Sequence, residues 1–121
     1  MKVTPERATR NSEFVPQVHI SFDGYGFRLL KPQAEKLLAV LKSYFDQSIR
    51  MQGVTKPDKL VRFFTGDPDI QIVEERPANA QGVFTDGTLQ IQVNERTAYF
   101  TVSNNDAKAL MIRLETILAD K

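Results

Sequence analysis

Hydrophobic and polar residues alternate in the first quarter of the chain, which is the period of a strand with one buried face. From residue 17 every second side chain is apolar, at Val18, Ile20 and Phe22. The side chains between them are polar: Gln17, His19 and Ser21. The pair Asp23-Gly24 suits a tight turn, and Phe27 and Leu29 resume the alternation. We therefore predict a β-hairpin near residues 17–30.

A longer period follows, with apolar residues recurring every three or four positions. These residues are Ala34, Leu37, Leu38, Leu41, Tyr44 and Phe45. Pro32 suits the first turn of a helix, where its missing N–H loses no partner. Arg50 suits the negative end of that helix and Gly53 its cap. The spacing therefore predicts an amphipathic helix that starts at Pro32 and reaches this cap.

The second half of the chain repeats these signals. Residues 60–65 and 70–75 are rich in β-formers and flank a turn at 66–69, which predicts a second hairpin. A short strand is expected at 83–85, followed by strands near 89–93 and 98–102. Asn104 is a good helix cap, and a second apolar stripe continues from Ala107 to Leu118. The predicted order is therefore ββα, ββ, βββα.

The two ββα segments coincide when the chain is shifted by 73 residues, the spacing from Val18 to Ile91. The shift superposes the alternation of both hairpins and the apolar stripes of both helices, for example Leu41 on Leu114. We predict an α+β fold in which a single antiparallel sheet of about six to seven strands carries two helices on one face, with a ββα pseudo-repeat. Residues 1–14 are expected to form a flexible arm, and residues 15–121 a single α+β domain.

Composition narrows the class of protein. A chain of 121 residues fits one hydrophobic core, and 41% hydrophobic residues are ordinary for a globular domain. Its apolar runs are shorter than a bilayer span, so we expect no membrane association. The absence of cysteine suits a reducing compartment, and the expected location is cytoplasmic. With 16 basic and 15 acidic residues, no strong net field favours phosphate backbones.

Candidate catalytic chemistry is sparse in this sequence. It has one histidine, no cysteine and no glycine-rich phosphate loop, so we expect no enzyme, no catalytic residue, no metal and no cofactor. Acidic residues gather around the turn of the second hairpin, at Asp67, Asp69, Glu74 and Glu75. They are interpreted as a solvated turn, with a hard-cation site or the acidic arm of a partner surface as the alternatives.

The predicted sheet face away from the helices carries the best candidate binding residues. These are Arg28, Arg62, Phe64 and Tyr99, with His19 as a secondary contributor. Aromatic rings that stack on bases and cations that follow the backbone are typical of proteins that bind single-stranded nucleic acid. At the level of architecture, two ββα units on one sheet resemble the single-strand-binding PUR and whirly families, although the first unit lacks their fourth strand. The resemblance implies no role for any individual residue.

Two functions are favoured at this point, and an accessory enzyme subunit, a small-ligand carrier or an enzyme is the third class that stays open. The chain is expected to be a non-enzymatic binding module, either for single-stranded nucleic acid or for a protein partner. The second alternative includes an adaptor or an inhibitor encoded by a mobile element. Unpaired strand edges also predict a homodimer, because small sheets are often completed by a second copy.

Overall fold

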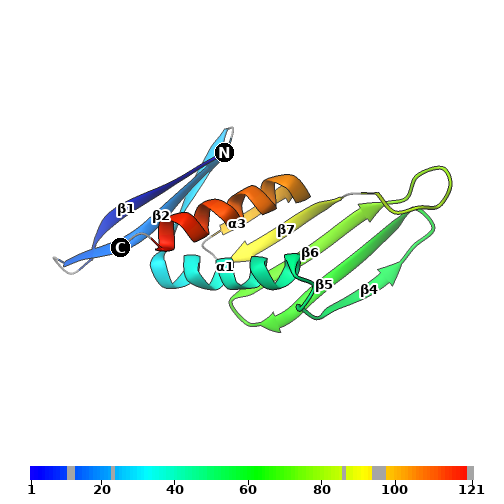
Figure 1. The fold of residues 1–121 in the computed structure, drawn as a ribbon, viewed down its shortest axis with the longest axis horizontal. Helices are drawn as coiled ribbons and strands as arrows, with labels where there is room; N and C mark the ends of the chain where they lie inside the picture. Colours follow the sequence, from blue (N-terminus) through cyan, green and yellow to red (C-terminus); the bar gives the residue numbers. More distant parts are fainter. Residues whose placement is uncertain (11–12, 23, 86, 94–97, 120–121) are drawn as a thin grey trace.

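The computed structural model describes residues 1–10, 13–22, 24–85, 87–93 and 98–119. Two helices and mainly antiparallel strands make up the described chain, which confirms the α+β class. The strands divide between a sheet of three and a sheet of five, where the sequence predicted a single sheet (Figure 1).

The smaller sheet has the order β1-β2-β3 and is antiparallel throughout. Its strands are β1 (Lys2–Arg10), β2 (Glu13–Phe22) and β3 (Tyr25–Leu30). The larger sheet has the order β4-β5-β6-β7-β8 and is also antiparallel. Its strands are β4 (Met51–Thr55), β5 (Lys59–Asp67), β6 (Ile70–Pro77), β7 (Thr88–Val93) and β8 (Ala98–Ser103).

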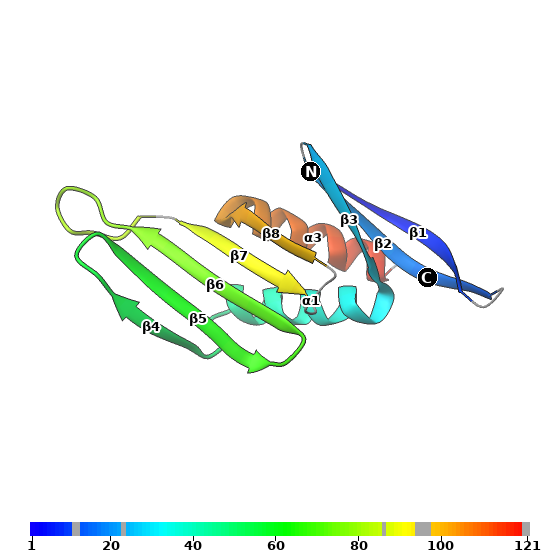
Figure 2. The same ribbon diagram turned by 180° about the vertical axis from the view of Figure 1, so that it is seen from behind.

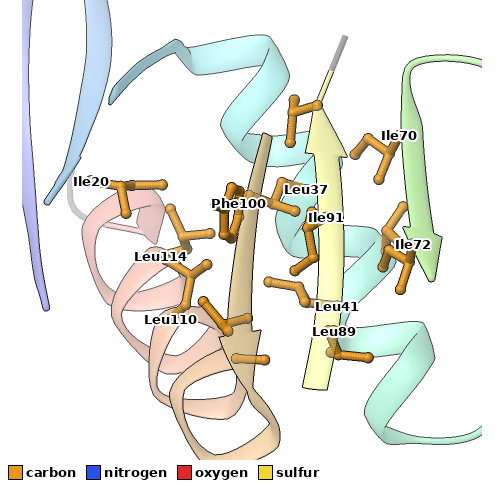
Figure 3. Close-up of a cluster of buried hydrophobic side chains, with 14 of the residues drawn as sticks. Ile20, Leu37, Leu41, Ile70, Ile72, Leu89, Ile91, Phe100, Leu110 and Leu114 are labelled. Atoms are coloured by element: carbon orange, nitrogen blue, oxygen red, sulfur yellow. The ribbon is translucent and has the colours of Figure 1, made fainter. Parts of the chain in front are cut away.

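The two helices, α1 (Lys31–Phe45) and α3 (Asn104–Ala119), lie side by side and antiparallel on one face of the larger sheet (Figure 1). The smaller sheet lies across one end of the helix pair and contacts both helices. Leucines in the middle of the two apolar stripes are fully buried: Leu37, Leu41, Leu110 and Leu114. They meet Ile20 from the smaller sheet and Phe100, Ile91 and Ile72 from the larger one (Figure 3).

The ββα repeat is present in the structure. A shift of 73 residues carries β3 onto β8 at both ends, and it carries the start of α1 at Lys31 onto the start of α3 at Asn104. The pattern of apolar residues was therefore sufficient to define both units. Strands β4, β5 and β6 are inserted between the units and extend the second sheet.

The boundary between the two sheets falls where the units meet. Strands β3 and β8 contact each other but belong to separate hydrogen-bonded ladders. Phe27 and Phe100, which occupy equivalent positions in the repeat, stack there with ring centroids 4.8 Å apart. Phe22 packs 5.7 Å from Phe100. Aromatic packing therefore joins the units at the junction of the two sheets.

The start of the chain differs from the prediction of a flexible arm. Residues 2–10 form β1, whose pairing with β2 runs from Lys2 opposite Ser21 to Arg10 opposite Glu13. Met1 and Val3 also pack against the core. Mixed charge and a proline hid this strand from sequence analysis, because its stability comes from the neighbouring strand.

The end of α1 also differs from the prediction. Pro32 lies in the first turn as expected, but the helix ends at Phe45, before Arg50 and Gly53. Gln47 takes a left-handed conformation with φ of 64°. The N–H of Ser48 donates to the carbonyl of Ser43 at 3.0 Å, a closure that usually uses glycine. This early ending releases Met51–Thr55 to form β4.

Neither described helix is long and apolar enough to span a bilayer.

In α3, Ser103 rather than Asn104 caps the N-terminus, because its hydroxyl oxygen accepts a 3.1 Å bond from the N–H of Asp106. The side chain of Asn104 is therefore available for contacts with the end of α1.

Truncation of either central leucine tests this packing. Leu41→Ala and Leu114→Ala should each lower the free energy of unfolding by about 2 to 5 kcal/mol, since both leave a cavity between helix and sheet. Ile112→Ala is the matched control on α3, because Ile112 is 54% exposed. Chemical denaturation measures all three. Losses below about 1 kcal/mol for the leucine variants would contradict the packing described here.

Candidate functional site

The five predicted binding residues do not lie on one surface. His19 and Arg28 face outward from the smaller sheet, where they are directly opposite each other on β2 and β3. Arg62 and Phe64 lie on β5 of the larger sheet. The side chain of Tyr99 lies outside the described residues.

On the smaller sheet, Arg28, one of the predicted binding residues, forms an ion pair with Glu6. The Glu6 carboxylate accepts hydrogen bonds from Arg28 Nε at 2.9 Å and from Gln17 Nε2 at 3.0 Å. His19 Nδ1 lies 3.5 Å from the same carboxylate. The Arg28 and Gln17 hydrogen bonds lower the pKa of Glu6. Arg28 therefore faces a carboxylate from its own sheet and presents a partly neutralised charge to solvent.

The prediction that Arg62 and Phe64 face away from the helices is wrong. Phe64 is opposite Ile72 and packs against the core, and Arg62 is opposite the buried Glu74. The sequence of β5 is ambiguous because apolar residues occupy both alternating sets of positions. A strand with apolar residues on both faces does not reveal which face is buried. Val61 and Phe63 consequently lie on the opposite face of the larger sheet, which the helices do not cover and which we call the open face.

Glu74 is the centre of a polar cluster between the larger sheet and the helices. Its side chain is only 1% exposed, although it carries a charge. Arg62 Nε donates to Glu74 Oε1 at 2.5 Å, and Arg76 Nη2 lies 3.4 Å from Oε2. The hydroxyl of Tyr44, near the end of α1, also donates to Oε2. Two hydrogen-bond donors, from α1 and β5, and a third group, the Arg76 guanidinium, therefore compensate the buried carboxylate.

The surroundings of this cluster shift the pKa values of Tyr44 and Glu74 in opposite directions. Burial raises the pKa of the Tyr44 hydroxyl, and the neighbouring Glu74 raises it further, so the phenol stays protonated and donates. Burial alone would raise the pKa of Glu74, but hydrogen bonds from Arg62 and Tyr44 outweigh it, and the pKa is lowered. Glu74 is therefore a charged acceptor at neutral pH.

The cluster also contains groups that sequence analysis did not select. Asn104 Nδ2 lies 3.4 Å from the Tyr44 hydroxyl, which brings the start of α3 to the end of α1. The sequence pattern places Tyr44 in the apolar stripe of its helix and Glu74 in a solvated turn. The one available signal was the position of Glu74 in an alternating strand, in phase with Ile70 and Ile72.

The acidic residues around the β5–β6 turn are divided among several cations. Lys36 of α1 pairs with Asp69 at 2.6 Å and with Asp67 at 3.3 Å. Glu75 pairs with Lys59 on the opposite side of the sheet from Glu74. Within the described part of the chain, no group of three acidic or histidine side chains is placed to hold a metal ion.

Figure 2 shows the face of the larger sheet that the helices do not cover. The centre of this open face is apolar. Phe63 is 39% exposed and Val54 is 51% exposed, and Val61 and Val73 lie on the paired strands beside them. Residues with amide or hydroxyl side chains occupy the flanking positions: Gln52, Gln71, Gln90, Gln92, Thr88 and Thr101. On the described strands of this face, the positive charge comes from Lys59, which donates to Glu75 at 3.0 Å. This face is therefore nearly neutral.

The geometry thus defines an α+β protein with two distinct features: a neutral, partly apolar sheet face and a buried ionic cluster on the opposite side of the same strands. Comparison with known proteins adds no family to this description. No family model matches the chain, and no curated protein or solved structure is significantly similar to it.

Neutralising Glu74 tests whether its ion pairs stabilise the fold. Glu74→Gln should reduce the free energy of unfolding by about 1 to 3 kcal/mol at neutral pH, because it removes charge-assisted hydrogen bonds in a buried site. Glu75→Gln is the matched control, since it removes a solvent-exposed ion pair and should cost less than about 1 kcal/mol. Equal effects in urea denaturation would show that Glu74 is no more important than a surface carboxylate.

Acid titration of stability provides a second test of Glu74. The pKa of Glu74 is lowered from an ordinary value of 4.5, so its stabilising contribution is present above that pH. The contribution should be lost as the pH falls from the ordinary value through the folded value. Wild type should therefore lose more stability than Glu74→Gln in this range. Glu6 and Asp46 also have lowered pKa values, but both proteins contain them, so the difference isolates Glu74.

Proposed function

We propose that this chain is a non-enzymatic protein-binding module that acts through the open face of its larger sheet. The observation that supports this most directly is the exposure of Phe63 and Val54 on a face whose described residues carry no net charge. An apolar centre with a polar border is the usual anatomy of a protein interface. The absence of cysteine agrees with action in the cytoplasm.

The electrostatics favour a protein over a nucleic acid. Binding of a single strand gains much of its affinity from cations that neutralise phosphates. Both arginines predicted for this role are bonded to carboxylates, Arg28 to Glu6 and Arg62 to Glu74. Lys59 on the open face is also paired. A ligand with one negative charge per nucleotide would therefore find little compensation there.

A second copy of the chain is the occupant that best fits this face. Two sheets pack face to face when their inner side chains are apolar and interdigitate. A neutral face meets its own twofold copy without charge repulsion, and homodimer interfaces are more apolar at the centre than other interfaces. Lys59 and Glu75, at the border of the apolar centre, also have opposite charges that a twofold partner can complement. The expected assembly is a dimer of open faces, not of strand edges.

The test is the mass of the protein in solution. Wild type should show about twice 13.7 kDa by light scattering at high micromolar concentration, and Phe63→Glu should show the monomer mass. Ile112→Glu, which adds the same charge at an exposed apolar position on α3, should remain a dimer. Circular dichroism would verify that both variants are folded. A wild-type monomer, or a dimeric Phe63→Glu, would contradict the proposal.

Binding assays with labelled single-stranded DNA and RNA test the alternative function. Neither should bind wild type at low salt and micromolar protein concentration. Saturable binding that Phe63→Ala abolishes and that weakens steeply with salt would instead assign the open face to nucleic acid.

A further inference from the structure

A cavity of about 470 Å³ lies on the other side of the larger sheet, next to the Glu74 cluster. Its walls come from the end of α1, the start of α3 and three strands, with Tyr44, Arg62, Arg76 and Asn104 among the lining residues. This volume lies within the range of sites that hold small molecules, and it exceeds what a water molecule or a bare ion fills. The cavity is independent of the open face and of the function proposed for it.

The charged groups at the cavity do not cancel. Arg62 and Arg76 carry two positive charges, and Glu74, the acid that they share, carries one negative charge. Each guanidinium has five N–H donors, and the bonds to Glu74 occupy only part of them. Arg76 Nε is buried and has no hydrogen-bond partner among the described residues. The arrangement therefore has one excess positive charge and a buried donor that remains to be satisfied.

The nearby helix ends also favour a negatively charged ligand. Asn104 is the first residue of α3, so the positive end of that helix dipole is at the cavity wall. The end of α1 is the negative end of its helix, but its carbonyls are partly occupied. The carbonyl of Tyr44 accepts the N–H of Gln47, and the carbonyl of Lys42 accepts the N–H of Asp46. Donors therefore predominate on the polar side of the cavity.

The remaining wall is apolar. Phe45, Ile49 and Met51 line the cavity from the end of α1, the following link and β4. A site with guanidinium groups on one side and apolar side chains on the other matches an amphipathic ligand. The single excess charge matches one carboxylate better than a doubly charged phosphate.

We propose that this cavity binds a small organic acid, with its carboxylate at Arg62 and Arg76 and its apolar body against Phe45, Ile49 and Met51. Arginine recognises a carboxylate through paired N–H donors, and both Arg62 and Arg76 line the cavity. Glu74 is a positioning residue, because it orients both guanidinium groups without contacting the ligand.

The experiment uses the full chain with benzoate and hexanoate as probes, at constant ionic strength and neutral pH. Titration followed by amide chemical shifts should show saturable binding at one site, with the changes concentrated around Phe45, Ile49 and Asn104. Benzamide has a similar shape without the charge, and it should bind at least about tenfold more weakly. Inorganic phosphate should also bind more weakly than benzoate, because it lacks the apolar body.

Two variants and a control assign the site. Arg76→Met should weaken benzoate binding by about tenfold or more, while Arg62 and Tyr44 still compensate Glu74. Ile49→Trp fills the apolar side and should reduce binding with every charge intact. Lys59→Met removes a cation that is also paired with a carboxylate, but on the open face, and should bind as wild type does.

Three results would overturn the proposal. Wild type that binds neither benzoate nor hexanoate at millimolar concentration has no site for an organic acid. Unchanged binding by Arg76→Met or Ile49→Trp, when the variant gives a folded spectrum, would place the ligand elsewhere. Phosphate that binds more tightly than benzoate would indicate a simple anion site. None of these results depends on the oligomeric state, so they are distinguishable from failure of the open-face proposal.

Discussion

Burial of the antiparallel helix pair organises both sheets of this protein. Each helix has an apolar stripe that must be buried, and the two stripes together are wide enough to contact both sheets. Leu41 and Leu114, which are equivalent in the repeat, lie fully buried at the centre of this packing (Figure 3). Since both helices cover the same face of the larger sheet, the opposite face is left open.

This arrangement gives β5 and β6 an unusual distribution of polarity. Their helix-facing side contains a buried ionic cluster at Glu74, and their solvent-facing side carries Phe63 and Val73. A well-packed apolar group in place of a buried ion pair is often equally stable or more stable. The cluster is therefore poorly explained by stability alone, and the adjoining cavity offers it a role in orienting donors toward a ligand.

The same distribution separates the two proposed activities in space. The open face has the neutral, apolar character of a protein contact, whereas the cavity has excess positive charge and lies among the ends of several elements. Strands β4, β5 and β6 contribute residues to the open face and to the cavity. All three belong to the insertion between the ββα units. The repeated units and the inserted strands both contribute to the core and to the cavity wall, and the apolar centre of the open face lies on the inserted strands.

Local periodicity in the sequence determined the helices, most of the strands and the ββα repeat. Alternation of period 2 and of about 3.6 reports which residues share a face, and a shift of 73 residues superposes β3 on β8 and α1 on α3. Local patterns failed where the chain depends on distant partners. The strand at residues 2–10 exists through its pairing with β2, and α1 ends early because Gln47 adopts a conformation that usually favours glycine.

Tertiary structure alone decided how the strands divide between two sheets and which face of β5 is buried. Val61 and Phe63 are as apolar as Leu60 and Phe64, so alternation in β5 is compatible with either orientation. The orientation was settled by contacts between distant segments, in which Glu74 meets Tyr44 from 30 positions earlier and Tyr44 meets Asn104 from 60 positions later. The amphipathic elements can be predicted from local sequence, because their periods span only a few neighbouring residues. The buried cluster and its cavity depend on contacts between distant segments, because a carboxylate becomes stable inside a protein only when long-range packing brings its donors together.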